Sequence, residues 1–184
     1  MFQRKFRSAD ITIEGIRRSI VSYQNAKNGL FYSRTYKEIL KIFSEASIPL
    51  RVALVFSWMV GQYRPALSNI EKLELSFKFP RFEHLTLRNI GIIGNAFAIA
   101  EAELGSIAAS KYLHFLAPNT FMMWDNKIQA YVFGKKLSSK GNRLRYERFC
   151  LELCQKYKRS KLRKKYLATY TAARLVDIWL WVRA

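Results

Sequence analysis

Apolar residues recur along this chain at the three- and four-residue spacing that is typical of amphipathic helices. The first such segment, from residue 10 to about residue 24, carries Ile13, Ile16, Ile20 and Tyr23 on one face. The same spacing predicts further helices over residues 35–47, 50–62, 68–77, 82–89, 93–103, 106–116, 125–133, 142–158 and 163–182. Alternation of the kind seen in strands is limited to residues 73–79. The pattern therefore predicts an all-α protein.

Capping residues, prolines and glycines mark where these helices begin and end. Thr35 with Glu38 and Ser68 with Glu71 have the spacing of capping boxes, and Pro49 suits the first turn of a helix. Neither a repeat nor a linker interrupts the sequence, so one compact domain is expected over residues 1–184, or two helical lobes with a cleft. Loops are expected at Gly91–Asn95, Ala117–Met123 and Gly134–Asn142.

The composition suits a folded domain. Of the 184 residues, 50% are apolar and 15% aromatic, which excludes a disordered basic tail. The longest segments without a charge, 52–63, 89–100 and 112–124, are shorter than the roughly 20 residues that span a bilayer, so no membrane insertion is expected. No apolar region follows the basic N-terminus, so no secretory signal is expected either. Two cysteines do not make a disulfide framework, which favours a reducing cytoplasm.

The net charge points to a polyanionic partner. The chain has 32 Lys and Arg against 13 Asp and Glu, a formal net charge of +19. Residues 1–51 carry a net +6 and residues 135–184 a net +12, whereas residues 52–134 carry only +1. Basic ends around a nearly neutral centre favour nucleic acid, with double-stranded DNA first and a nucleoid-associated location. An anionic membrane surface and a merely solvated lysine-rich surface are the alternatives.

Several kinds of chemistry have no support in the sequence. No P-loop, dinucleotide-binding glycine motif or GxSxG elbow occurs, and the pair Gly91 and Gly94 is expected to break a helix rather than bind phosphate. Cys150 and Cys154 share one helix face, but further metal ligands are not near them in the sequence. Neither a metal nor a cofactor is therefore expected.

The segment from Gly105 to Ile128 carries a constellation that suggests catalysis. It predicts a helix, a turn containing Pro118 and a second helix. Lys111 falls early in the first helix among apolar residues, where desolvation and the helix dipole both favour the neutral, nucleophilic amine. Asp125 falls at the start of the second helix, where backbone amides keep a carboxylate ionised. Because a short turn joins the helices, both side chains are expected at one cleft.

This segment resembles the catalytic region of a known superfamily. Ser110–Leu116 and Phe121–Asp125 are similar to the pattern SK-x-L-H-F-L, then P, then F-x-x-W-D. We associate it with the helix-hairpin-helix DNA glycosylases, on their 8-oxoguanine DNA glycosylase side. Ala173–Trp181 also resembles the closing helix of such proteins. The glycines of the family's hairpin have no counterpart at Ile107–Ala109, and only Gly105 lies upstream.

The resemblance implies a helix-hairpin-helix fold and a DNA N-glycosylase with associated AP-lyase activity. Such an enzyme flips a damaged base, for example an oxidised guanine, out of double-stranded DNA. The resemblance further implies that Lys111 attacks C1′ and forms a Schiff base, while Asp125 stabilises the developing positive charge. The residues alone leave two simpler roles open, a lysine at a helix edge and an ordinary N-cap. The chain would then be a non-enzymatic helical DNA- or RNA-binding protein.

Further residues are candidates for binding. His114, on the same helix face as Lys111, and Met123 and Trp124, just before Asp125, are candidates for a base pocket, with core packing as the alternative. The basic residues near the C-terminus are candidates for contact with phosphates, with a solvated surface as the alternative: Arg143, Arg145, Lys156, Lys158, Arg159, Lys161, Arg163, Lys164 and Lys165.

Overall fold

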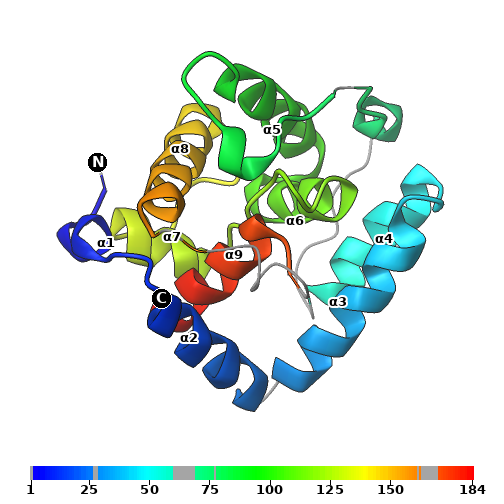
Figure 1. The fold of residues 1–184 in the computed structure, drawn as a ribbon. Coiled ribbons are helices and arrows are strands. Elements are labelled where there is room, and N and C mark those ends of the chain that lie inside the picture. The colour runs from blue at the N-terminus through cyan, green and yellow to red at the C-terminus, as the bar shows by residue number, and fades with distance from the viewer. Residues whose placement is uncertain (1, 27–28, 60–68, 77, 161, 163–169) are drawn as a thin grey trace.

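A computed structural model describes residues 2–26, 29–59, 69–76, 78–160, 162 and 170–184. Within these ranges the chain is helical and contains no strand, which confirms the predicted all-α class and a compact arrangement (Figure 1). The α-helices are α1 (Arg4–Ser8), α2 (Ile13–Asn25), α3 (Gly29–Phe43), α4 (Ile48–Trp58), α5 (Ile90–Leu104), α6 (Ser106–Leu116), α7 (Asn126–Phe133), α8 (Arg143–Arg159) and α9 (Ala172–Arg183). Two short 3-10 helices, η1 (Ile70–Leu73) and η2 (Phe82–His84), precede α5.

Helix α9 occupies the centre of the molecule. Every residue from Ala172 to Leu180 is buried, including the charged Arg174 and Asp177. Helix α2 packs along α9, α5 packs against both α6 and α8, and α3 and α4 lie beside α6 (Figure 1). Helix α9 is therefore surrounded by earlier helices, and the charges of Arg174 and Asp177 lie in the interior.

An aromatic cluster fills the space between α5, α7 and α8. The Tyr146 ring stacks on the Phe97 ring with centroids 4.0 Å apart, and the Trp124 ring lies 5.2 Å from Tyr146. The Tyr146 hydroxyl donates a hydrogen bond of 2.6 Å to the carbonyl of Met122. Stacked rings of this size contribute much of the apolar area that a helical core buries. They hold the segment between α6 and α7 against the rest of the core.

The start of α8 is fixed by a buried carboxylate on α5. The side chain of Glu101 accepts hydrogen bonds from the backbone amides of Gly141 and Asn142 and from the side-chain amide of Asn142. These three donor–acceptor distances lie between 2.8 and 3.0 Å. A carboxylate that accepts several N–H groups is well compensated for its burial. Helix α8 therefore starts from a rigid point.

Several predicted boundaries agree with the structure. Helix α6 has the predicted limits of 106 and 116, and Asp125 caps α7 as expected. The segments between α6 and α7 and between α7 and α8 are the predicted loops, the second leaving α7 at Gly134 with φ +79°. Pro49 lies in the first turn of α4.

Other predicted boundaries are wrong. Residues 91–95 are not a loop but part of α5, and the glycine pair does not break that helix. A Cβ at Gly94 would overlap the Glu147 side chain of α8, so this glycine permits close packing of the two helices. Thr35 does not cap a helix, since it lies inside α3 and its hydroxyl accepts a hydrogen bond from Trp58 at 3.2 Å. The capping role given to Ser68 lies outside the described residues.

Two segments predicted as helices are shorter in the structure. The described part of 68–77 contains only η1, and 82–89 contains only η2. The helix predicted over 163–182 corresponds to α9 from residue 172 onward, and residues 163–169 lie outside the described part. No helix in the described ranges is long and apolar enough to cross a bilayer.

Candidate functional site

The side chain of Ser110 connects the two halves of the candidate site. Its Oγ accepts a hydrogen bond of 3.0 Å from the backbone amide of Trp124 and lies 3.2 Å from the carbonyl of that residue. Both residues are buried. Lys111 and Asp125 are the next residues along the chain from these two partners. The contact therefore ties the helix that carries the lysine to the segment that carries the aspartate.

Asp125 begins α7. Its Oδ1 accepts a hydrogen bond of 2.8 Å from the amide of Ile128, which is the geometry of a helix N-cap. Among the described residues, the second carboxylate oxygen has no hydrogen-bond partner. One oxygen thus fixes the side chain in place, and the other takes no part in this cap.

Lys111 lies in α6 with its side chain largely buried. Its amine is 5.4 Å from the centre of the Trp58 ring of α4, at cation–π distance. Burial lowers the pKa of Lys111 below its ordinary value, while the negative charges of Asp125 and Asp177 oppose that effect and Arg174 adds to it. The direction is the one expected for a lysine among apolar residues. The neutral form of the amine is therefore more populated than it is in an exposed lysine.

Arg174 and Asp177 form a buried ion pair on α9 beside this lysine. The Arg174 guanidinium donates to the Asp177 carboxylate and to the Tyr23 hydroxyl, the latter at 2.8 Å, and it lies 4.5 Å from the centre of the Tyr36 ring. Burial raises the pKa of Asp177 to about 6, against the lowering effect of Arg174. The Lys111 amine thus interacts electrostatically with two carboxylates and one guanidinium, a combination suited to proton transfer near neutral pH.

Arg174 and Asp177 were not predicted from the sequence as site residues. A signal was present, because they lie three residues apart in a helix whose other residues from Ala172 to Val182 are apolar. Charged residues at that spacing on a buried helix pair with each other. Tyr23 and Tyr36 come from helices far away in the sequence, so their positions around the pair, like that of Trp58 beside Lys111, follow only from the tertiary structure.

The three predicted pocket residues lie in the core. His114 is buried, with Nε2 2.7 Å from the Tyr36 hydroxyl and Nδ1 2.6 Å from the carbonyl of Phe121. Burial lowers the pKa of His114 to about 3, so the ring is neutral at physiological pH. Met123 and Trp124 are buried as well, the sulfur of Met123 lying 3.7 Å from Arg174. This placement corresponds to the alternative of core packing.

The predicted phosphate-binding residues divide into several groups. Lys156 is buried, and its amine donates to the carbonyls of Arg7 and Ala9, each at 2.8 Å. The Lys158 amine donates to the carbonyl of Leu85 at 3.2 Å, and Arg143 pairs with Glu147. Arg145 and Arg159 are exposed. The remaining predicted residues lie outside the described part of the chain: Lys161, Arg163, Lys164 and Lys165.

Within the described ranges, no group of three or more His, Cys, Asp or Glu side chains is placed to hold a metal ion. Cys150 and Cys154 are buried free thiols, and burial raises the pKa of both. Comparison with protein-family models, with curated proteins and with solved structures finds no match for this chain. The arrangement around Lys111 therefore has to be interpreted from its own chemistry.

Proposed function

We propose that this protein is a DNA base-excision enzyme, an N-glycosylase with associated AP-lyase activity. The observation that carries the proposal is the environment of Lys111. Its amine has a lowered pKa, lies at cation–π distance from the Trp58 ring and interacts electrostatically with Asp125 and Asp177. An amine that is neutral part of the time, beside carboxylates that accept protons or stabilise positive charge, suits attack on a sugar carbon.

In the proposed reaction, Lys111 Nζ forms a bond to C1′ of a damaged nucleotide. The bond from C1′ to the base breaks, and the base leaves with that electron pair and takes up a proton from solvent. Nζ loses a proton, and the sugar ring then opens: the nitrogen lone pair forms the C1′=N bond of the protonated imine, and O4′ leaves C1′ with its electron pair and takes up a proton. Loss of a proton from C2′ breaks the bond from C3′ to its phosphate oxygen, and water finally hydrolyses the imine. No oxidant or reductant is required.

Asp125 has the role of a stabilising carboxylate in this proposal. Its fixed Oδ1 holds the side chain, and its second oxygen faces the positive charge that develops at C1′ and on the imine. Asp177, with a pKa of about 6, is a candidate to take the proton that Lys111 releases. Basic segments before and after this centre, with net charges of +6 and +12, favour the approach of DNA.

Borohydride trapping tests the proposal. The protein is incubated with duplex DNA that contains 8-oxoguanine or an abasic site, and the imine is reduced to a stable protein–DNA adduct. Lys111→Gln is expected to abolish trapping. Lys127→Gln is the matched control, because Lys127 is an exposed lysine only two residues after Asp125 and should leave trapping unchanged. Equal trapping by wild type and Lys111→Gln would refute the proposal.

A second candidate function is a non-enzymatic nucleic-acid-binding protein. The observation in its favour is the burial of His114, Met123 and Trp124, since none of these side chains is exposed to stack on a flipped base. This candidate predicts binding that weakens steeply with salt and does not change in Lys111→Gln or Asp125→Asn. A binding titration of the two variants against wild type separates it from the enzyme.

A further inference from the structure

A basic pocket lies between α1, the end of α7 and the start of α8. It has a volume of about 390 Å³ and is lined by Phe2, Arg7, Phe133, Arg145 and Arg148. All three arginines are exposed and both phenylalanines are partly exposed. Three guanidinium groups and two aromatic rings therefore share one open concavity. None of these residues belongs to the group around Lys111.

Contacts between α1, α7 and α8 hold the walls of this pocket in place. The Lys156 amine of α8 donates to the carbonyls of Arg7 and Ala9 at the end of α1. At the other end of α1, the amide of Gln3 donates to the carbonyl of Val132 of α7 at 2.8 Å. The Phe2 ring rests 5.4 Å from the Phe133 ring. Arg7 is thus held beside α8 before any ligand arrives, which reduces the entropy lost on binding.

The positive charge of the pocket is not compensated locally. The two acidic residues of α8 are engaged with other cations, Glu147 with Arg143 at 3.0 Å and Glu152 with Lys156 at 3.8 Å. Within the described part of the chain, no carboxylate forms an ion pair with the pocket arginines. Three like charges held together in this way attract an anion with several acceptor oxygens.

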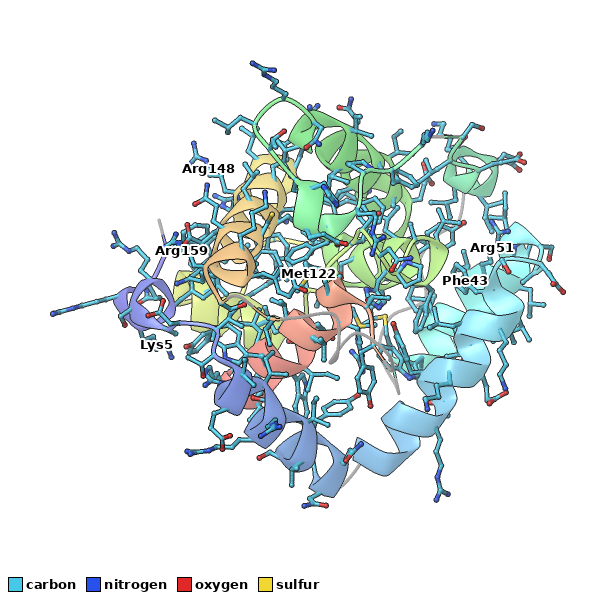
Figure 2. The ribbon with its side chains drawn as sticks, viewed as in Figure 1. Lys5, Phe43, Arg51, Met122, Arg148 and Arg159 are labelled. Atoms are coloured by element: carbon cyan, nitrogen blue, oxygen red, sulfur yellow. The ribbon has the colours of Figure 1, made fainter. Side chains whose placement is uncertain are left out.

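We propose that this pocket binds one phosphodiester group and the adjacent base of an unpaired DNA strand. The arginines match the phosphate oxygens, and the partly exposed phenylalanine rings offer a surface on which a base stacks. A base in a duplex is already stacked and paired, so the aromatic part of the pocket favours a single strand. Figure 2 shows Lys5 and Arg148 on the side of the molecule formed by α1 and α8, opposite Arg51 beside α4. The pocket is a binding site separate from Lys111, and the proposal does not depend on the chemistry of that lysine.

Fluorescence anisotropy with labelled oligothymidylate and with an undamaged duplex tests this proposal. In the double variant Arg145→Gln/Arg148→Gln, affinity for the single strand is expected to fall about tenfold or more at physiological salt. The slope of log affinity against log salt should also become shallower by about 0.7 for each phosphate that the variant no longer neutralises. The matched control is Lys37→Gln/Arg88→Gln, which removes the same charge from exposed positions away from the pocket. It should change affinity only slightly.

A second variant tests the aromatic part of the pocket. Phe2→Leu keeps the charge and is expected to weaken binding of the single strand more than binding of the duplex, by up to about tenfold. Equal losses in the arginine variant and its control would overturn the proposal, because net charge alone would then explain binding. Binding of inorganic phosphate without any binding of oligothymidylate would also overturn it, as would binding to acidic vesicles but not to DNA. These binding results do not depend on whether Lys111→Gln abolishes borohydride trapping, so the two proposals can fail separately.

Discussion

The hydrogen bond between the amide of Trp124 and the Ser110 hydroxyl, 3.0 Å long and buried, sets the position of Lys111 relative to Asp125. The two charged residues lie on different helices, and each directly follows one partner of this bond. The loop between the helices is held by the carbonyls of Phe121 and Met122, which accept hydrogen bonds from His114 and Tyr146. The candidate site is therefore fixed by polar contacts within the core and not by an ion pair between Lys111 and Asp125.

Replacing Ser110 by Ala is expected to lower the free energy of unfolding by about 1–3 kcal/mol, because the buried amide of Trp124 loses its partner. Urea unfolding followed by tryptophan fluorescence measures this change. Ser76→Ala is a suitable control at an exposed position and should stay within about 0.5 kcal/mol of wild type. A Ser110 variant as stable as wild type would show that this hydrogen bond does not hold the two helices together.

The burial of His114 predicts a dependence of stability on pH. The folded protein does not protonate this ring until about pH 3, whereas the unfolded chain does so below about pH 6.5. The unfolded state therefore binds more protons between these values, and this residue makes the protein less stable as the pH falls through that window. Between pH 7 and pH 5 its contribution should decrease by about 2 kcal/mol.

Asp177 acts in the opposite direction. Its pKa rises from 3.8 to about 6 on folding, so the folded state takes up this proton first and its contribution to stability increases as the pH falls from 6 toward 3.8. The effect of His114 is therefore measured as the difference in the free energy of unfolding between wild type and His114→Gln, in which the contribution of Asp177 cancels. This difference, measured by urea unfolding, should decrease as the pH falls from 7 to 5. A constant difference would contradict the assignment.

Lys156 is expected to act on stability and only indirectly on DNA binding. In Lys156→Met, two partly buried carbonyls lose their donor, and the free energy of unfolding should fall by about 1–3 kcal/mol. Arg159→Gln, at an exposed position on the same helix, should leave stability within about 0.5 kcal/mol of wild type. Thermal unfolding of both variants makes the comparison. If Lys156→Met were as stable as wild type and only bound DNA more weakly, a direct phosphate contact would be the better explanation.

Gly94 and Glu147 are expected to be energetically coupled. Alanine is a better helix former than glycine by about 1 kcal/mol, but a Cβ at position 94 displaces the Glu147 side chain from its pairing with Arg143. The change in the free energy of unfolding caused by Gly94→Ala should therefore be less favourable in wild type than in a Glu147→Ala background, by at least about 0.5 kcal/mol. A double-mutant cycle in urea measures the coupling, and a value near zero would contradict the close packing of α5 on α8.

The sequence predicted most of the fold because its signals were local. The limits of α6 and the cap at Asp125 follow from residues that act within a few positions of each other. Gly94 misled the prediction because glycine marks both helix ends and close helix packing, and only the partner helix distinguishes the two. Thr35 matched a capping motif inside a helix that begins six residues earlier at Gly29.

The sequence predicted only part of the candidate site, because only some of its residues lie close together along the chain. Lys111 and Asp125 are joined by a short loop, so the sequence could place them together. The ion pair of Arg174 and Asp177 approaches from the end of the chain, and nothing local predicts its neighbours. Lys156 belongs to a run of basic residues, yet it also falls on the face of α8 that buries Leu153 and Tyr157. The position of Lys156 on the buried face of the helix therefore determined its environment, and the basic residues next to it in the sequence did not.

In the proposed reaction, the Lys111 amine is the group that reacts with DNA. Peptide mass spectrometry of the borohydride-reduced adduct with abasic-site DNA tests this directly, because it identifies the lysine that carries the sugar. The adduct is expected on the peptide that contains Lys111, and its yield should decrease in Asp125→Asn. An adduct spread over exposed lysines such as Lys127, with none at Lys111, would contradict the claim.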